Sequence, residues 1–82
     1  MKTLESYTAE LIEYLLVVRT PEQMEQALRE LLTPAEFTEI TKRLQIFKML
    51  DAGVPQRKIA EQLGVGIATV SRGARARRPD NE

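Results

Sequence analysis

Apolar side chains recur at every third or fourth position along most of this chain, the spacing that places them on one face of an α-helix. The third segment shows the pattern well, with Phe37, Ile40, Leu44 and Phe47 in succession. Strict alternation of apolar and polar residues is absent, and β-branched residues do not cluster. The sequence therefore predicts an all-α chain of five helices. Their expected bounds are 4–19, 21–32, 34–52, 55–63 and 67–77.

The predicted helix starts share one device. Thr20 and Thr33 each precede a proline, and Gln23 or Glu36 follows three positions after the threonine. A threonine cap, proline at the first helical position and a Glu or Gln that reaches back are typical of a helix N-terminus. Pro55 is expected to open the fourth helix in the same first position. Other ends are marked by Gly53, Gly64, Gly66 and Pro79.

The first predicted helix carries more apolar surface than one core face needs. Its main stripe is Leu4, Tyr7, Leu11, Tyr14, Leu15 and Val18, with Ile12, Leu16 and Val17 outside the stripe. A chain of 82 residues without cysteine buries little surface and has no disulfide to supplement its core. We therefore expect a homodimer. In this interpretation the chain is one helical DNA-binding domain, with a dimerisation core (1–54), a helix-turn-helix (55–78) and a disordered tail (79–82).

Charge is distributed unevenly, although the net charge is zero. Residues 56–78 carry six basic side chains and one acidic side chain, whereas residues 1–55 have a net charge of −3. A basic third suits a polyanionic partner, and its plain alternative is a solvated helix face. Histidine and cysteine are absent, and the carboxylates are scattered, so we expect no catalysis and no common zinc site. Apolar runs are short, which predicts a cytoplasmic protein without a membrane partner.

Residues 56–75 have the pattern of a helix-turn-helix. Gly64 would supply the positive φ of the turn, and the small side chain of Ala60 suits a close crossing of two helices. The other constrained positions hold apolar residues: Ile59, Leu63, Val65 and Val70. A helix pair that only packs, as in a non-catalytic protein-interaction module, explains these positions equally well. It does not explain the basic side chains on the same segment.

In a DNA-binding helix-turn-helix, the N-terminal residues of the second helix meet the base edges in the major groove. Ile67 and Ala68 could contact thymine methyl groups, while the hydroxyls of Thr69 and Ser71 could bond bases directly or through water. Gly66 would let the backbone approach closely. Arg57 and Lys58 are expected to contact phosphates or a flanking base. The other residues expected to contact phosphates are Arg75, Arg77 and Arg78.

From residue 31 to about 75 the chain resembles the tryptophan repressor family. The matching residues are Leu-Leu-Thr-Pro-Ala-Glu (31–36), Arg43, Gly53, Gln56-Arg57, Leu63-Gly64 and Gly-Ile-Ala-Thr-Val-Ser-Arg-Gly (66–73). The resemblance implies an intertwined homodimer that represses transcription at palindromic operators in double-stranded DNA. It also implies a corepressor, L-tryptophan, that tilts the second motif helix into the groove.

The resemblance further assigns a ligand site. Arg43 and Arg72 would sandwich an indole ring, and Arg72 would bind the ligand carboxylate with help from Thr33 of the other subunit. The main-chain carbonyls of Glu30 and Leu32 would accept from the ligand amine.

A glycine inside the last helix, Gly73, costs about 1 kcal/mol relative to alanine, and a ligand filling the space would account for it. Two other predicted site residues depart from the family pattern. Ala76 stands where the family has a serine that helps to hold the ligand amine, and Phe47 stands where it has a valine beneath the ring. The sequence therefore leaves three alternatives open: tryptophan, a related indole carboxylate that lacks the amine, or a regulator that needs no ligand.

Overall fold

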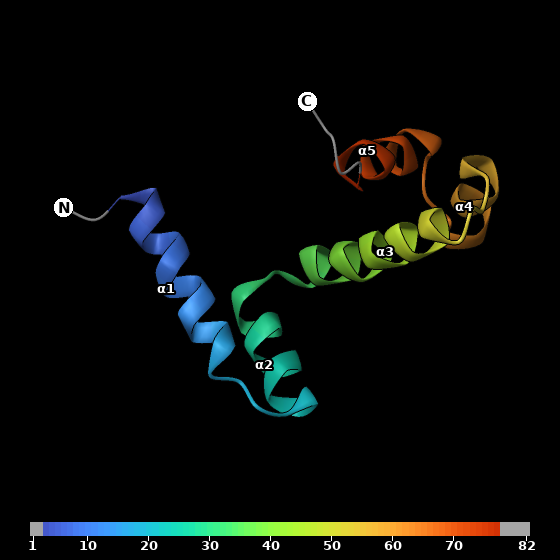
Figure 1. Ribbon diagram of the computed structural model, residues 1–82. Helices are drawn as coiled ribbons and strands as arrows, with labels where there is room; N and C mark the ends of the chain where they lie inside the picture. Colours follow the sequence, from blue (N-terminus) through green and yellow to red (C-terminus); the bar gives the residue numbers. More distant parts are fainter. Residues whose placement is uncertain (1–2, 78–82) are drawn as a thin grey trace. The chain divides into compact units, whose positions relative to one another are not determined.

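The computed structural model describes residues 3–77, and these residues form five α-helices and no strand (Figure 1). The helices are α1 (Leu4–Leu16), α2 (Pro21–Leu31), α3 (Pro34–Asp51), α4 (Gln56–Leu63) and α5 (Ile67–Arg77). The predicted all-α class is confirmed. The predicted disordered tail (79–82) and Arg78 lie outside the described residues. No described helix is both long and apolar enough to cross a bilayer.

Helix caps explain where the first three helices begin. The amide of Gln23 donates to the Thr20 hydroxyl at 3.1 Å, so Thr20 caps α2 as predicted. Thr33 and Glu36 form the predicted reciprocal pair, in which each backbone amide donates to the other side chain, at 2.8 and 3.1 Å. Thr3 caps α1 in a similar box with Ser6, which the sequence analysis did not single out.

Four helices differ from their predicted bounds: α2, α3 and α4 by one residue each and α1 by three residues. α1 ends at Leu16, three residues early, because the chain must become extended to place Thr20 as the cap of α2. The amide of Arg19 there donates to the Gln23 side chain at 3.2 Å, outside any helix. Pro55 precedes α4 as its N-cap, with an extended ψ of 145°, so its expected place as the first helical residue was wrong by one position.

The described chain divides into two compact units, Met1–Phe37 and Thr38–Glu82. The N-terminal unit holds α1, α2 and the first turn of α3, and its one buried side chain is Ala27 among the described residues. The guanidinium of Arg29 lies over the Phe37 ring at 4.1 Å from its centroid. The predicted division at residue 54 concerns roles in dimerisation and DNA binding, and it stays a prediction.

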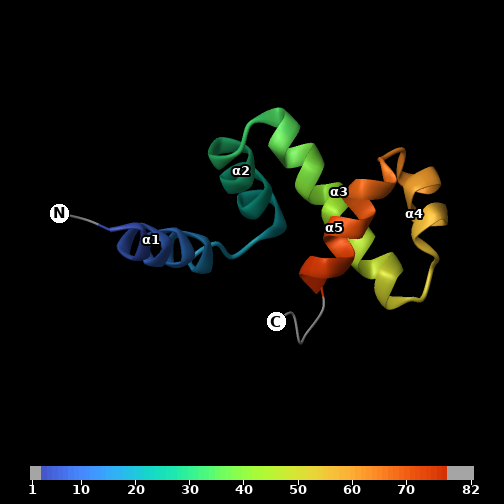
Figure 2. The same ribbon diagram turned by 90° about the horizontal axis from the view of Figure 1, so that it is seen from above.

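The C-terminal unit has a closed core. Ile46 of α3, Ile59 of α4 and Val70 of α5 are almost completely buried against one another. Half-buried apolar residues surround them: Met49, Leu50, Val54, Ala60, Leu63 and Val65. In both views α4 lies beside the C-terminal end of α3, and Figure 2 shows α5 crossing α3. Three helix segments from different parts of the chain thus share one core.

The turn between α4 and α5 has the predicted form. Gly64 takes a left-handed conformation with φ 66° and ψ 38°, which is unfavourable for residues with a Cβ. The amide of Val65 then donates to the carbonyl of Ala60 at 3.1 Å, which closes the end of α4. The chain reverses there within three residues, so the start of α5 lies next to α4.

Candidate DNA-binding surface and ligand pocket

The predicted base-reading residues lie at the exposed start of α5. Ile67 is 51% exposed, Gly66 and Ala68 are also exposed, and Thr69 and Ser71 are half-buried. Val70 in the same stretch is fully buried, so the core fixes the rotation of α5 about its own axis. An added Cβ at Gly66 would meet nothing within 4 Å, so the protein itself does not require glycine there. The first turn of α5 therefore offers a small, mixed apolar and hydroxylic surface to solvent.

Three predicted phosphate-contacting residues are exposed on the same two helices, α4 and α5. Arg57 and Lys58 are exposed in the first turn of α4, and Arg75 is exposed in the last turn of α5. None of the three makes an ion pair with a described residue. Exposed cations without a protein counterion remain available to phosphates. Arg77 differs, because it pairs with Asp51.

Ser71 has a partner that the sequence analysis missed. Its hydroxyl donates to the Oε1 atom of Gln56 at 2.9 Å, which joins α5 to the first residue of α4. Gln56 keeps its amide N–H groups for other acceptors. The predicted contact of Ser71 with a base stays a prediction, and the structure adds Gln56 to the residues on this surface.

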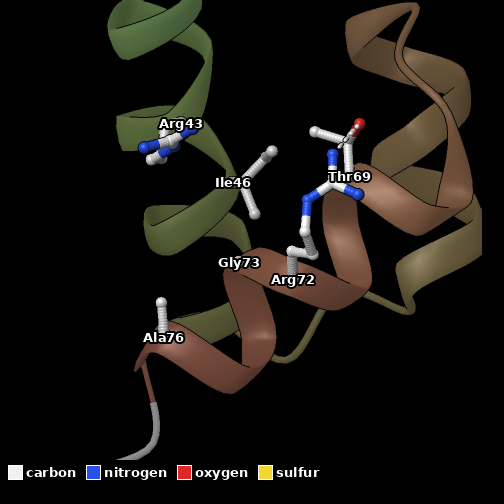
Figure 3. Close-up of a pocket in the computed structure, with 6 residues that line it drawn as sticks. All are labelled: Arg43, Ile46, Thr69, Arg72, Gly73 and Ala76. Atoms are coloured by element: carbon white, nitrogen blue, oxygen red, sulfur yellow. Dashed lines mark hydrogen bonds between the residues drawn. The ribbon is translucent and has the colours of Figure 1, made fainter.

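A pocket of about 220 Å³ lies on the same unit, between α3 and the part of α5 from Thr69 to Ala76 (Figure 3). Its lining residues are Arg43, Ile46, Thr69, Arg72, Gly73 and Ala76. Four of these six were predicted ligand-binding residues, while Ile46 is new and Thr69 was predicted to contact DNA. Ile46, Gly73 and Ala76 supply apolar surface, and no acidic side chain lines the pocket. This composition suits a flat apolar body that carries an anionic group.

The two arginines reach the pocket from different helices. Arg43 comes from α3 and Arg72 from α5, and Figure 3 shows them on either side of Ile46. Arg72 donates to the Thr69 hydroxyl at 3.4 Å, and Arg43 pairs with Glu39 one turn before it on α3, at 3.2 Å. Both guanidiniums are exposed, and their present contacts are weak or screened by solvent. Breaking these contacts to bind a ligand would therefore require little free energy.

Gly73 has a structural role that needs no ligand. It is buried, and an ideal Cβ built on it would lie 2.8 Å from the Cγ2 methyl of Ile46. Glycine therefore lets α5 pass close to α3. Phe47 lies beside it, 3.9 Å from the same Cβ position, but is not among the residues that line the pocket. The expected part of Phe47 in the ligand site stays a prediction.

Three predicted ligand residues belong to the N-terminal unit. Glu30 lies in α2, Leu32 is the C-cap residue of that helix, and Thr33 caps α3. The Thr33 oxygen accepts from the Glu36 amide, which leaves its own O–H able to donate. The contacts of Glu30 and Leu32 with a ligand amine, and of Thr33 with a ligand held by the other subunit, stay predictions.

Comparison with known proteins identifies the family. A family model described as Trp repressor protein matches residues 6–80. A "Trp operon repressor homolog" from Mannheimia succiniciproducens is 36% identical over 74 residues, which cover 89% of this chain and 72% of that relative. Proteins of the same description from Vibrio campbellii and Vibrio parahaemolyticus are each 43% identical over 54 residues and 65% of this chain. The chain spans about half the length of these Vibrio relatives, 54% and 52% respectively.

No solved structure matches this chain significantly. Because the family model covers most of the sequence, this chain belongs to the Trp repressor family.

Proposed function

We propose that this chain is a transcriptional repressor that binds operator DNA through the first turn of α5. The observation that carries the proposal is the juxtaposition at the turn around Gly64. Beyond that turn Ile67 and Ala68 are exposed at the start of α5. The hydrogen bond between Ser71 and Gln56 joins α5 to the first turn of α4, which carries the exposed Arg57 and Lys58. A recognition helix has this arrangement, with small or apolar side chains at the base edges and cations beside the phosphates. The protein has no catalytic role in this proposal and works in the cytoplasm.

The active form in this proposal is a homodimer on a palindromic operator. α1 has no buried side chain, and Leu4, Leu16 and Val17 are 79%, 75% and 70% exposed. Exposed apolar area of this extent is typical of a surface that a partner covers. Two copies related by two-fold symmetry would present two reading helices to half-sites about one helical turn apart.

The ligand in this proposal is L-tryptophan or a related indole carboxylate. The pocket offers two guanidiniums and an apolar wall, and guanidiniums bind carboxylates and stack on aromatic faces. Ala76 adds a methyl group and no hydrogen-bonding atom. None of the six lining side chains therefore has a carboxylate that could accept from a ligand amine. This absence favours an indole acid that has no amine.

A second candidate is a DNA-binding regulator that needs no ligand. The close approach of Gly73 to Ile46 favours it, because that contact accounts for the helix glycine without a bound molecule. The two candidates share the DNA surface and differ only in whether ligand changes the affinity.

One titration series tests the proposal. Duplexes are selected from a randomised pool with the wild-type chain in three separate arms, without additive, with L-tryptophan and with indole-3-propionate, and the affinity of the enriched duplexes is measured under the same three conditions. Tighter binding with either acid supports the ligand-switched repressor, and equal affinity in all three supports the ligand-independent one. Failure to enrich any sequence, with weak binding that is equal for all duplexes, would refute the repressor assignment.

Variants then assign the roles. Thr69→Ala is expected to relax the preference at one base pair, because the lost hydroxyl contact is sequence-specific. Arg57→Gln is expected to weaken binding to every duplex and to lower the salt slope by about one, as for a lost phosphate contact. Glu61→Gln, which removes an exposed negative charge from α4 and no predicted DNA contact, serves as the control and is expected not to weaken binding. If both test variants behave like this control, the assigned contacts are wrong.

A further inference from the structure

One ion pair connects the ends of two helices in the C-terminal unit. The Nη2 and Nε atoms of Arg77 donate to the two carboxylate oxygens of Asp51 at 2.7 and 3.4 Å. Asp51 is the last residue of α3 and Arg77 is the last residue of α5, 26 positions further along the chain. The Arg77 guanidinium also lies 5.3 Å from the centroid of the Phe47 ring. Two separate contacts therefore hold this side chain against α3.

The pair lies at the opposite end of α5 from the reading surface. Val70 and Gly73 fix the middle of α5 against the core, and Gly73 is in close contact with Ile46. Arg77 adds a second point of attachment one helical turn beyond Gly73. Contacts confined to the middle of a helix leave its direction less restrained than contacts that also hold one of its ends. Because Ile67 lies about 15 Å from Arg77 along the axis, a tilt about the middle of α5 moves both ends.

We propose that Asp51 and Arg77, supported by Phe47, form a clamp that sets the direction of α5 and so strengthens DNA binding from outside the DNA contact surface. Both are positioning residues in this inference, which rests on the proposed DNA-binding function. From the sequence alone, Arg77 is instead expected to contact phosphate directly. In that alternative, Asp51 only competes with DNA for the guanidinium.

The two interpretations give opposite signs for one substitution. Asp51→Asn removes a negative charge and releases Arg77. If Arg77 binds phosphate, this change strengthens DNA binding, because it removes both repulsion and a competitor. If the pair is a clamp, the same change weakens binding, because α5 loses its second attachment. The sign of the effect therefore decides between them.

The test measures affinity for a duplex selected by the wild-type chain, as a function of salt concentration. Asp51→Asn is expected to weaken binding about two- to fivefold, the range of an exposed but well-aligned ion pair. Its salt slope is expected to equal that of the wild type, because the number of phosphate contacts is unchanged. Glu61→Gln removes the same charge from α4 at a residue without an ion pair among the described residues, and is expected not to weaken binding.

A charge exchange provides the rescue. The double variant Asp51→Arg/Arg77→Asp keeps the total charge and restores a pair of the same length. It is expected to bind more tightly than Arg77→Asp alone and to approach the wild type. A double variant that binds no better than Arg77→Asp alone, or an Asp51→Asn variant that binds as tightly as the wild type or more tightly, overturns the clamp.

A measurement without DNA separates this inference from the proposed function. Amide hydrogen exchange reports the opening of α5 in the protein alone. Asp51→Asn is expected to speed exchange in the last two turns of α5, and the charge exchange to reverse it, with Glu61→Gln as the control. If the wild type selects no duplex, the proposed repressor function fails. The clamp is then tested by the hydrogen-exchange rates alone. Unchanged exchange in Asp51→Asn refutes it.

Discussion

The two units of this chain use apolar residues in opposite ways. In the C-terminal unit, Ile46, Ile59 and Val70 from three helices are buried to 1% exposure or less. In the N-terminal unit, α1 carries at least as many large apolar side chains and buries none of them. The C-terminal unit thus forms its core from one chain. The N-terminal unit has the residues for a core, but α1 and α2 by themselves leave most of them exposed.

This difference teaches which part of the protein depends on a partner. Burying an apolar side chain stabilises a fold, and leaving it in water forgoes that contribution. The helix-turn-helix half is expected to fold with its own contacts. The N-terminal half is expected to gain most of its stability from a second copy, so stability and concentration should be coupled there.

The largest expected effect tests the closed core. Ile59→Ala should lower the free energy of unfolding by about 3 kcal/mol, because it removes a fully buried side chain and leaves a cavity. Urea titration followed by circular dichroism measures it. Ile12→Ala, at a side chain 52% exposed in α1, is the matched comparison. In a monomer it should cost under about 0.5 kcal/mol, so a cost near that of Ile59→Ala would show that Ile12 is buried in an assembly.

The next effect concerns the uncovered surface of α1. Leu11→Glu places a charge in the middle of the apolar stripe, at a residue 45% exposed within one chain. It should weaken dimerisation by about 2 kcal/mol or more, since a buried unpaired charge is unfavourable. Sedimentation equilibrium should then show monomers at concentrations where the wild type is dimeric. Glu13→Gln on the same helix is the control, and equal association of the wild type and Leu11→Glu would contradict the predicted interface.

A smaller effect is expected where α5 crosses α3. Gly73→Ala should destabilise the C-terminal unit by about 1 kcal/mol. The new Cβ would approach the Ile46 methyl to 2.8 Å, and this strain should exceed the gain in helix propensity. Thermal unfolding measures the change. Ile46→Ala should remove most of the added cost of Gly73→Ala in the double variant, whereas simple additivity of the two costs would show that the contact is not the cause.

The smallest expected effect depends on pH. The hydrogen bond from Arg77 holds the pKa of Asp51 below the ordinary value of 3.8; desolvation opposes this shift, and the charge of Arg77 adds to it. A depressed folded-state pKa stabilises the fold above the unfolded value, and this contribution is lost as pH falls through the folded value. The difference in melting temperature between the wild type and Asp51→Asn should therefore be present at neutral pH and should shrink below pH 3.8. A difference that stays constant down to pH 2 would mean that the carboxylate charge is not its source.

Local residue patterns were enough to predict most of the secondary structure. Thr20 and Thr33 cap their helices as expected, and Gly64 takes the left-handed conformation that its turn requires. These features depend on atoms within four residues of one another, so the sequence order itself specifies them. The end of α1 was misplaced because apolar periodicity continues past Leu16, while the cap of the next helix interrupts the backbone.

The pocket was predicted in part. Arg43 and Arg72 lie 29 positions apart, and only the family resemblance connected them before the structure placed both beside Ile46. The contact of Ile46 with Gly73 had no sequence signal beyond a glycine in an unusual place. Ser71 with Gln56, and Asp51 with Arg77, likewise join residues whose spacing follows no helical repeat.

Residue order alone was thus enough to predict the five helices, the caps at Thr20 and Thr33, the turn at Gly64 and the uneven placement of charge. These follow from backbone hydrogen bonding and side-chain periodicity, which act over a few residues. Only the tertiary structure decided that Gly73 lets α5 lie close against α3 and that Arg77 is tied to Asp51 instead of being an unpaired cation. The reason is geometric, because contacts between helices depend on how the shared core orients them, and that orientation is not encoded in any single segment.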